Sequence, residues 1–142
     1  MKNNRLQMKQ IYMSMAFLLA KRSSCRRLAV GCVITSSDLE QVYSVGYNGN
    51  AKGLKNNCDS NQVGNCGCIH SEINALIKCS VKDKNKVVFI TDMPCITCSK
   101  VLINSGLSKL YYNREYRDKS GIEQIKSCGI ITERIMEFPK EI

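Results

Sequence analysis

Two short motifs in the middle of the chain contain the residues whose types and spacing could carry out chemistry. His70, the only histidine in the sequence, is followed two residues later by Glu72, and further on Cys95 and Cys98 form a pair. One imidazole and two thiolates are typical ligands of catalytic zinc, which keeps its fourth position open for water. The motifs therefore predict a catalytic zinc site formed by His70, Cys95 and Cys98. Glu72 is the predicted general acid and base beside it.

Both motifs are expected at the beginning of a helix. Pro94 disfavours helical backbone before it and supports a helix just after it, so Cys95 and Cys98 would face the same way in a first turn. The positive end of a helix favours the thiolate form that binds metals. Taken singly, a lone histidine is usually a hydrogen-bonded structural residue, and a lone Cys-x-x-Cys also occurs in redox pairs and structural zinc sites. Together the two motifs form the signature of zinc deaminases.

Alternating helices and strands are expected to position the motifs. Apolar residues at helical spacing predict a first helix over about 6–21, with an apolar stripe formed by Leu6, Met8, Ile11, Tyr12, Met15, Leu18 and Leu19. Further helices are predicted over 70–80, 95–103 and 121–127, and strands over 28–36, 41–47, 86–91, 110–112 and 128–135. The first two strands would form an antiparallel hairpin, and the later βα alternation predicts parallel strands. In the helix over 70–80, the expected apolar face consists of Ile73, Leu76 and Ile77.

The composition fits a single globular domain over residues 1–142. A hydrophobic share of 44% is ordinary, and no apolar run reaches the roughly 18 residues of a membrane span. Nine cysteines, an odd number in clusters, argue against a secreted disulfide framework and for core thiols or metal ligands in a reducing cytoplasm. The formal charge of +9 suggests an anionic partner such as a nucleotide phosphate or a nucleic acid.

Five segments of the chain resemble the cytidine deaminase superfamily, and within it the deoxycytidylate (dCMP) deaminases. The segments are 25–31, 46–49, 70–75, 94–98 and 104–112. The Gly-Tyr-Asn-Gly and Tyr-Tyr sequences separate this branch from tRNA adenosine deaminases and free cytidine deaminases. The resemblance implies a cytidine deaminase-like three-layer α/β/α fold, with a five-stranded mixed sheet flanked by helices. One departure is Ser71, where the family usually has alanine.

The resemblance also implies an activity and substrate contacts. The reaction would be hydrolysis of dCMP to dUMP and ammonia, supplying dUMP for dTMP synthesis, with Glu72 moving the protons. Arg27 would hold the phosphate, or is instead a solvated surface arginine. Asn48 matches a substrate-contacting asparagine, or is instead a turn residue. The backbone N–H of Ser71 would bind the pyrimidine carbonyl, and Tyr116 would pack against the nucleotide.

A second zinc is predicted in the long irregular loop over 46–68. Such a loop in a compact domain is usually functional or disordered. Its cysteines favour a functional loop that a bound metal cross-links. Some dCMP deaminases carry a structural zinc here, with one ligand from the segment that matches Cys25 and another two residues before the catalytic histidine. The resemblance therefore implies a closed four-thiolate site of Cys25, Cys58, Cys66 and Cys68. The alternative is reduced cysteines without a metal. The remaining cysteines are expected in the core: Cys32, Cys79 and Cys128.

Two other functional classes stay open. A nucleic-acid deaminase, or one acting on another cytosine or adenine substrate, is permitted by the charge. An aromatic content of 6% and the lack of tryptophan disfavour base-stacking platforms for nucleic acid. A zinc-stapled binding module without catalysis is disfavoured by Glu72. The resemblance further implies a cytoplasmic homo-oligomer, in many relatives a hexamer, with dCTP and Mg²⁺ as activator and dTTP as inhibitor.

Overall fold

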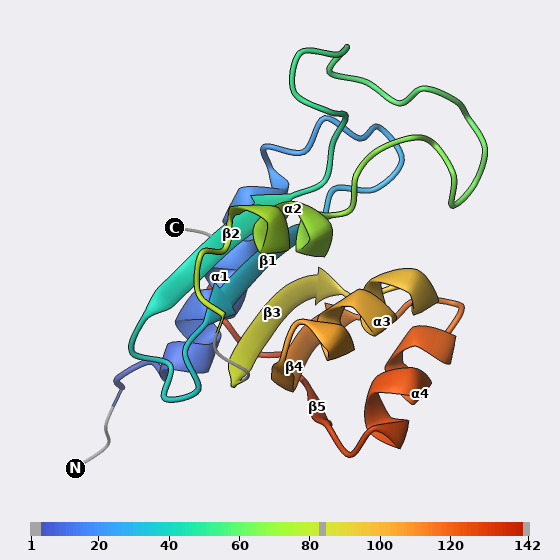
Figure 1. Cartoon of the computed structure of the whole chain (residues 1–142). Helices are drawn as coiled ribbons and strands as arrows, with labels where there is room; N and C mark the ends of the chain where they lie inside the picture. Colours follow the sequence, from blue (N-terminus) through green and yellow to red (C-terminus); the bar gives the residue numbers. More distant parts are fainter. Residues whose placement is uncertain (1–3, 83–84, 141–142) are drawn as a thin grey trace.

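The computed structural model describes residues 4–82 and 85–140, which contain four helices and five strands in the predicted order (Figure 1). The helices are α1 (Met8–Ala20), α2 (Ser71–Lys78), α3 (Ile96–Asn104) and α4 (Ser120–Ser127). The strands are β1 (Gly31–Thr35), β2 (Val42–Tyr47), β3 (Lys86–Asp92), β4 (Leu107–Arg114) and β5 (Ile131–Arg134). β4 is longer than the predicted 110–112 because its pairing with β3 extends over polar residues at both ends.

The strands form one mixed sheet in the order β2-β1-β3-β4-β5. β1 is antiparallel to both β2 and β3, whereas β3, β4 and β5 are parallel to one another. The predicted hairpin and the predicted parallel βα units are therefore confirmed. β3 occupies the centre of the sheet, so it joins the N-terminal hairpin to the C-terminal parallel strands.

Helices cover both faces of this sheet, which confirms the predicted three-layer α/β/α fold (Figure 1). α1 packs on the face that presents Val33, Phe89 and Tyr111, and the rings of Phe89 and Tyr111 stack with their centroids 4.6 Å apart. The other three helices cover the opposite face, where Ile34 and Ile90 are buried. Successive strand residues alternate between the two cores, as expected for a sheet that is buried on both sides.

The predicted apolar faces of two helices were wrong in part. In α1 the buried residues are Tyr12, Met13, Ser14, Ala16 and Ala20. Leu6 and Leu18 of the predicted stripe are 45% and 44% exposed. In α2 the buried face contains Glu72 and Ala75, and Ile77 is 71% exposed. Tyr12 of the predicted stripe is buried, but several other buried positions in the two helices are small residues, Ser14, Ala16 and Ala20 in α1 and Ala75 in α2, which contribute little to an apolar periodicity. Of the helices in the described ranges, none combines the length and the apolar character needed to cross a membrane.

The end of α4 explains a further difference from the sequence prediction. Cys128 is the C-cap of α4, and Gly129 follows it with a φ of 75°, a conformation that commonly terminates helices. β5 therefore begins only at Ile131 rather than at residue 128. Cys128 is exposed and not a core residue, whereas Cys32 and Cys79 are buried as predicted.

Gly31 allows α1 to lie directly on the sheet. A Cβ at this position would lie 1.8 Å from the carbonyl oxygen of Ala16 and 2.8 Å from the amide nitrogen of Ala20. We expect Gly31→Ala to lower the free energy of unfolding by about 3 kcal/mol, because the backbone of α1 must move away. Urea denaturation measures this loss. Gly53→Ala is the control, since only its positive φ penalises a side chain, and should cost about 1 kcal/mol. Equal losses would contradict the close-packing argument.

The two chemical motifs meet at one edge of the sheet. β3 ends at Asp92, and the chain then enters α3, whose N-cap is Cys95. α2 begins directly after its own N-cap, His70, and follows β2, which runs in the same direction as β3 because both are antiparallel to β1. His70 and Cys95 lie around one cavity with Asp92, the last residue of β3, so both helix N-termini are at the carboxyl end of the central strand, which is the usual position of active sites in α/β sheets.

Candidate active site

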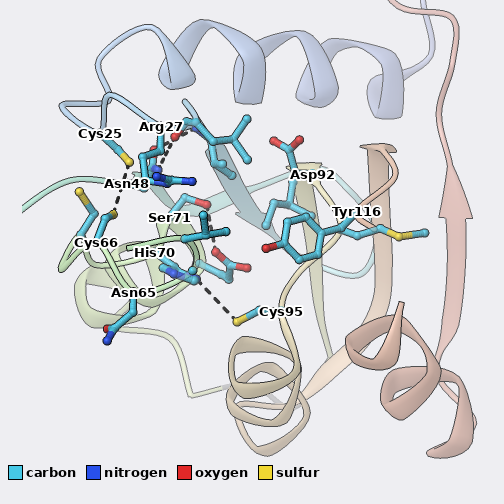
Figure 2. A pocket seen from close by; sticks show the side chains of 18 of the residues that line it. Cys25, Arg27, Asn48, Asn65, Cys66, His70, Ser71, Asp92, Cys95 and Tyr116 are labelled. Carbon is cyan, nitrogen blue, oxygen red and sulfur yellow. Dashed lines mark hydrogen bonds between the residues drawn. The ribbon is translucent and has the colours of Figure 1, made fainter. Parts of the chain in front are cut away.

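A cavity of about 540 Å³ opens at this edge of the sheet (Figure 2). Its walls come from the segment before β1, the loop between β2 and α2, the N-termini of α2 and α3, and the loop after β4. The volume is within the range of sites that bind small molecules. His70, Glu72 and Cys95 line the cavity, and Cys98 is buried beside it.

His70, Cys95 and Cys98 form a cluster whose dimensions fit a zinc ion. Nδ1 of His70 lies 3.2 Å from Sγ of Cys98 and 3.7 Å from Sγ of Cys95. Tetrahedral zinc with bonds of about 2.0–2.3 Å would separate such donor atoms by roughly 3.5–3.8 Å, which matches the distance from His70 to Cys95, whereas the distance from His70 to Cys98 is a few tenths of an ångström shorter. His70 is exposed, Cys95 is half-buried and Cys98 is buried, and the first two line the cavity, so the cluster is accessible from it. An open side of this kind is characteristic of catalytic rather than structural zinc.

The electrostatics of the thiol pair also favour a cation. The Cys98 thiol, His70 and the Cys98 backbone N–H, whose nitrogen lies 3.4 Å from Sγ of Cys95, lower the pKa of Cys95 to about 4. Conversely, the neighbouring Cys95 and burial raise the pKa of Cys98. Two adjacent thiolates repel each other, so both can be ionised together only when a cation lies between them.

Glu72 is buried beside the cluster, with 2% of its surface exposed. Burial raises the pKa of its carboxyl group, although its backbone N–H and the charge of His70 oppose the rise. Oγ of Ser71 donates a hydrogen bond to Oε1 of Glu72 over 3.1 Å, which orients the carboxyl group. A buried carboxyl group with a raised pKa holds a proton more readily than an exposed one, so it is suited to accept a proton and return it.

A second thiol cluster lies at the edge of the same cavity. The structure brings together the four cysteines that the sequence analysis grouped: Cys25, Cys58, Cys66 and Cys68. Sγ of Cys25 lies 3.7 Å from Sγ of Cys58 and 3.8 Å from Sγ of Cys66, and the Cys58 and Cys68 sulfurs are 3.8 Å apart. Tetrahedral zinc with bonds of about 2.3 Å places sulfur ligands roughly 3.8 Å apart, whereas a disulfide requires about 2.05 Å. The separations therefore fit a closed zinc site and exclude disulfides.

This cluster cross-links a loop that has little other support. Between residues 48 and 70, the structure contains no helix or strand beyond a single bridge between Gly49 and Ile69, and most side chains over 52–65 are exposed. Burial opposes ionisation of Cys58, but hydrogen bonds from the Arg26 backbone N–H and the neighbouring thiols lower its pKa to about 7. Burial and the neighbouring thiols of Cys25, Cys66 and Cys58 raise the pKa of Cys68. As at the first cluster, full ionisation requires a cation.

The predicted substrate contacts Arg27 and Asn48 both line the cavity. Arg27 is exposed, and its Nη1 donates to the carbonyl oxygen of Asn61 over 2.8 Å, so other guanidinium N–H groups remain for a ligand. Asn48 is buried and holds the segment before β1: its Nδ2 donates to the Leu28 carbonyl (2.6 Å) and its Oδ1 accepts from the Val30 N–H (2.9 Å). One N–H of the Asn48 amide remains available to the cavity.

Tyr116 is half-buried and lines the cavity, and its hydroxyl points towards Ser71 and His70 in Figure 2. Arg117 and Asp92 also line the cavity and were not predicted as site residues. Neither belongs to a motif. The signal that could have found them is the parallel βα architecture, because it brings the segments after β3 and β4 to the same edge of the sheet.

Comparison with known proteins agrees with this geometry. Residues 6–114 match the family described as "Cytidine and deoxycytidylate deaminase zinc-binding region". The deoxycytidylate deaminase of Saccharomyces cerevisiae is 34% identical over 144 residues, covering 92% of this chain and 45% of the yeast protein. ComE operon protein 2 of Bacillus subtilis is 30% identical over 139 residues, covering 92% of this chain and 72% of that protein. The crystal structure of dCMP deaminase from the cyanophage S-TIM5 in complex with dCMP and dUMP has a TM-score of 0.83 and 31% identity, covering 94% of this chain and 100% of the phage chain.

An open His-Cys-Cys cluster at two helix N-termini, with a buried glutamate beside it, defines the class of zinc-dependent deaminases. The chain belongs to the cytidine and deoxycytidylate deaminase zinc-binding family, which confirms the resemblance found in the sequence. It spans less than half of the yeast relative, 45%, but corresponds to the whole of the cyanophage chain.

Proposed function

We propose that the protein hydrolyses dCMP to dUMP and ammonia, and so provides dUMP for dTMP synthesis. One observation carries the proposal: a single cavity combines the open metal-binding cluster, the buried Glu72 carboxyl group and two arginines, Arg27 and Arg117, that can bind a phosphate. The relatives support this substrate, because the yeast protein is a deoxycytidylate deaminase and the cyanophage enzyme was crystallised with dCMP and dUMP.

In the proposed mechanism, His70, Cys95 and Cys98 hold zinc. The chemistry that zinc supplies in such a site is Lewis-acid activation of water. Glu72 would carry one proton of the attacking water to the ring nitrogen, and then the second proton, taken from the hydroxyl group added to the ring, to the amine, which leaves as ammonia. Because burial raises its pKa, the Glu72 carboxyl group can hold a proton between these two transfers. The backbone N–H of Ser71 would donate a hydrogen bond to the pyrimidine carbonyl oxygen.

Other residues around the cavity are proposed to bind the rest of the substrate. Asn48 contacts the sugar through its remaining amide N–H, and Tyr116 packs against the nucleotide. Arg27 and Arg117 bind the phosphate, since a guanidinium group can form two hydrogen bonds with it. Within the described ranges, the Arg117 guanidinium makes no hydrogen bond or ion pair with the protein, so it can reorient towards a ligand.

A substrate panel tests the proposed function. The zinc-loaded protein is incubated with dCMP, cytidine, dCTP and single-stranded DNA, and ammonia release is measured. We expect dCMP to be the preferred substrate. Release from DNA but not from dCMP would indicate a nucleic-acid deaminase instead. No release from any substrate would indicate a zinc-stapled binding module.

Arg27 is expected to control the affinity for the phosphate. Arg27→Gln should raise KM for dCMP about tenfold to a hundredfold, because a hydrogen-bonded charge pair with the phosphate is lost. The kinetic constants for deoxycytidine, which lacks the phosphate, should change little. Arg22→Gln is the matched control, since Arg22 lies over the ring of Tyr47 and does not line the cavity. Equal effects on the two substrates would mean that Arg27 only supports the fold.

We also propose that Cys25, Cys58, Cys66 and Cys68 bind a second, structural zinc. The sulfur separations of 3.7–3.8 Å support it. The site is closed, with four protein ligands, so it has no position for a reacting water. Its proposed role is to hold the loop that forms one wall of the cavity.

The larger context of the enzyme is proposed from its family resemblance. Residues 1–142 are assigned to one deaminase domain, supported by a sheet that combines strands from both halves of the chain. A cytoplasmic location is supported by nine unpaired thiols. Assembly into a homo-oligomer, with a hexamer as the expected form, is supported by Ile77 on α2 and Val101 on α3, which are 71% and 38% exposed. Regulation by dCTP with Mg²⁺ as activator and by dTTP as inhibitor is also proposed, with no effector site named.

A further inference from the structure

Asp92 places a negative charge in a cavity that is proposed to bind an anionic nucleotide. The residue lines the cavity, and its side chain is 10% exposed. In Figure 2 the Asp92 carboxylate points away from His70 and Cys95 and lies on the same side of them as Arg27, the proposed phosphate ligand. An unpaired carboxylate there would repel a phosphate. A nucleotide site at this position therefore requires a group that cancels the charge of Asp92.

Arg114 is in a position to cancel this charge. Asp92 and Arg114 are partners in the parallel register of β3 and β4, so their side chains lie on the same face of the sheet. Nε of Arg114 lies 2.8 Å from Oδ1 of Asp92, and Nη2 lies 2.9 Å from Oδ2, which is a bidentate ion pair. The guanidinium is also held over the ring of Phe17, 5.1 Å from its centroid.

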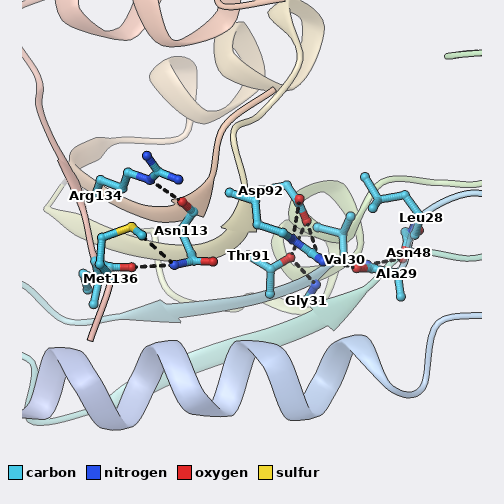
Figure 3. Close-up of polar contacts among 12 residues, drawn as sticks. Leu28, Ala29, Val30, Gly31, Asn48, Thr91, Asp92, Asn113, Arg134 and Met136 are labelled. Carbon is cyan, nitrogen blue, oxygen red and sulfur yellow. Dashed lines mark hydrogen bonds and ion pairs between the residues drawn. The ribbon is translucent and has the colours of Figure 1, made fainter. Parts of the chain in front are cut away.

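The same network contacts the segment that carries Arg27. Nη2 of Arg114 donates to the carbonyl oxygen of Ala29 over 3.0 Å. The Gly31 N–H donates to Oγ1 of Thr91 over 3.3 Å, and Figure 3 shows Gly31, Thr91 and Asp92 together. The Thr91 hydroxyl in turn donates to the Asp92 carboxylate over 2.7 Å. A purely structural role of Arg114 would consist of this tether to Ala29. Such a role would affect every ligand of the cavity, charged or not.

We propose that Arg114 is a positioning residue for substrate specificity: its ion pair with Asp92 removes a negative charge that would otherwise reject the phosphate. Arg114 itself does not line the cavity, so it acts through Asp92. The inference rests on the proposed function and deepens it. It assigns part of the preference for a nucleotide over a nucleoside to an ion pair between β3 and β4.

A comparison of charged and uncharged ligands tests the inference. The zinc-loaded parent, Arg114→Gln and the double variant Asp92→Asn/Arg114→Gln are assayed with dCMP and deoxycytidine. Their affinities for the products dUMP and deoxyuridine are measured by calorimetry. In Arg114→Gln, KM for dCMP and Kd for dUMP should rise about tenfold or more, while the nucleoside values change less than about threefold. In the double variant, the nucleotide values should return to within about threefold of the parent.

Arg134→Gln is the matched control for the loss of one positive charge. Arg134 lies at the end of β5 and pairs over 2.6 Å with Glu115, which directly follows β4, and neither residue lines the cavity, so its removal should leave all four values unchanged. Equal losses for nucleotide and nucleoside in Arg114→Gln would overturn the inference in favour of the tether. A double variant as weak as Arg114→Gln would do the same.

Failure of the proposed function would give a different result. The zinc-loaded parent would then release no ammonia from dCMP, but binding of dUMP against deoxyuridine would still report the effect of Arg114. A parent that binds dUMP no better than deoxyuridine overturns the inference, because there would be no phosphate preference for the ion pair to maintain.

Discussion

Replacement of Glu72 by glutamine is expected to lower kcat for dCMP by about a hundredfold to ten-thousandfold while zinc stays bound. The amide has nearly the same shape as the carboxyl group, so the buried site beside Ser71 should accept it. It cannot, however, take a proton from water or return one to the substrate. Glu72 contributes no donor atom to the cluster of His70, Cys95 and Cys98, so the metal content should be unchanged. Steady-state kinetics and metal analysis of the same preparation measure both quantities.

Glu123→Gln provides the matched control for this experiment. Glu123 lies in the first turn of α4 and is exposed, so the substitution removes one negative charge far from any proton transfer. Its kcat and zinc content should equal those of the parent. Turnover of Glu72→Gln near the parent rate would refute the role of Glu72, and loss of zinc from this variant would assign Glu72 to the metal instead.

Replacement of Cys58 by serine is expected to reduce the zinc content from two ions to one per chain. A closed thiolate site depends on all four ligands, and the loop has few other tertiary supports. We expect Tm to fall by roughly 5–10 °C, as for a loss of about 2 kcal/mol in a domain of this size. KM for dCMP should also rise, because the loop forms a cavity wall and contacts Arg27 through Asn61.

Two other cysteine variants separate the two metal sites. Cys98→Ser should also leave one zinc per chain, but it should abolish turnover because it removes a ligand of the catalytic site. Cys128→Ser should change neither zinc content nor activity, since Cys128 is exposed and belongs to neither cluster. A parent protein that contains one zinc per chain would refute the second site.

Much of the fold could be predicted because its signals are local. Strands such as β3 are short apolar runs between polar segments, and each helix of the second half follows a strand. The positions of His70 and Cys95 at helix N-termini also follow from adjacent residues, Pro94 in particular. The buried faces of α1 and α2 were predicted less well. Close approach of a helix to the sheet depends on Gly31 and on small helical residues, and these contribute little to an apolar pattern.

The groups that can react are apparent from local sequence. The residue types and short spacings of His70, Glu72, Cys95 and Cys98 are enough, because ligands and acid lie within one turn of two helix starts. The surroundings of these groups, in contrast, depend on contacts between distant segments of the chain. Asp92 and Arg114 are 22 residues apart and meet through the parallel register of β3 and β4. Such a register arises from long-range hydrogen bonding between strands, and no local periodicity in the chain encodes it.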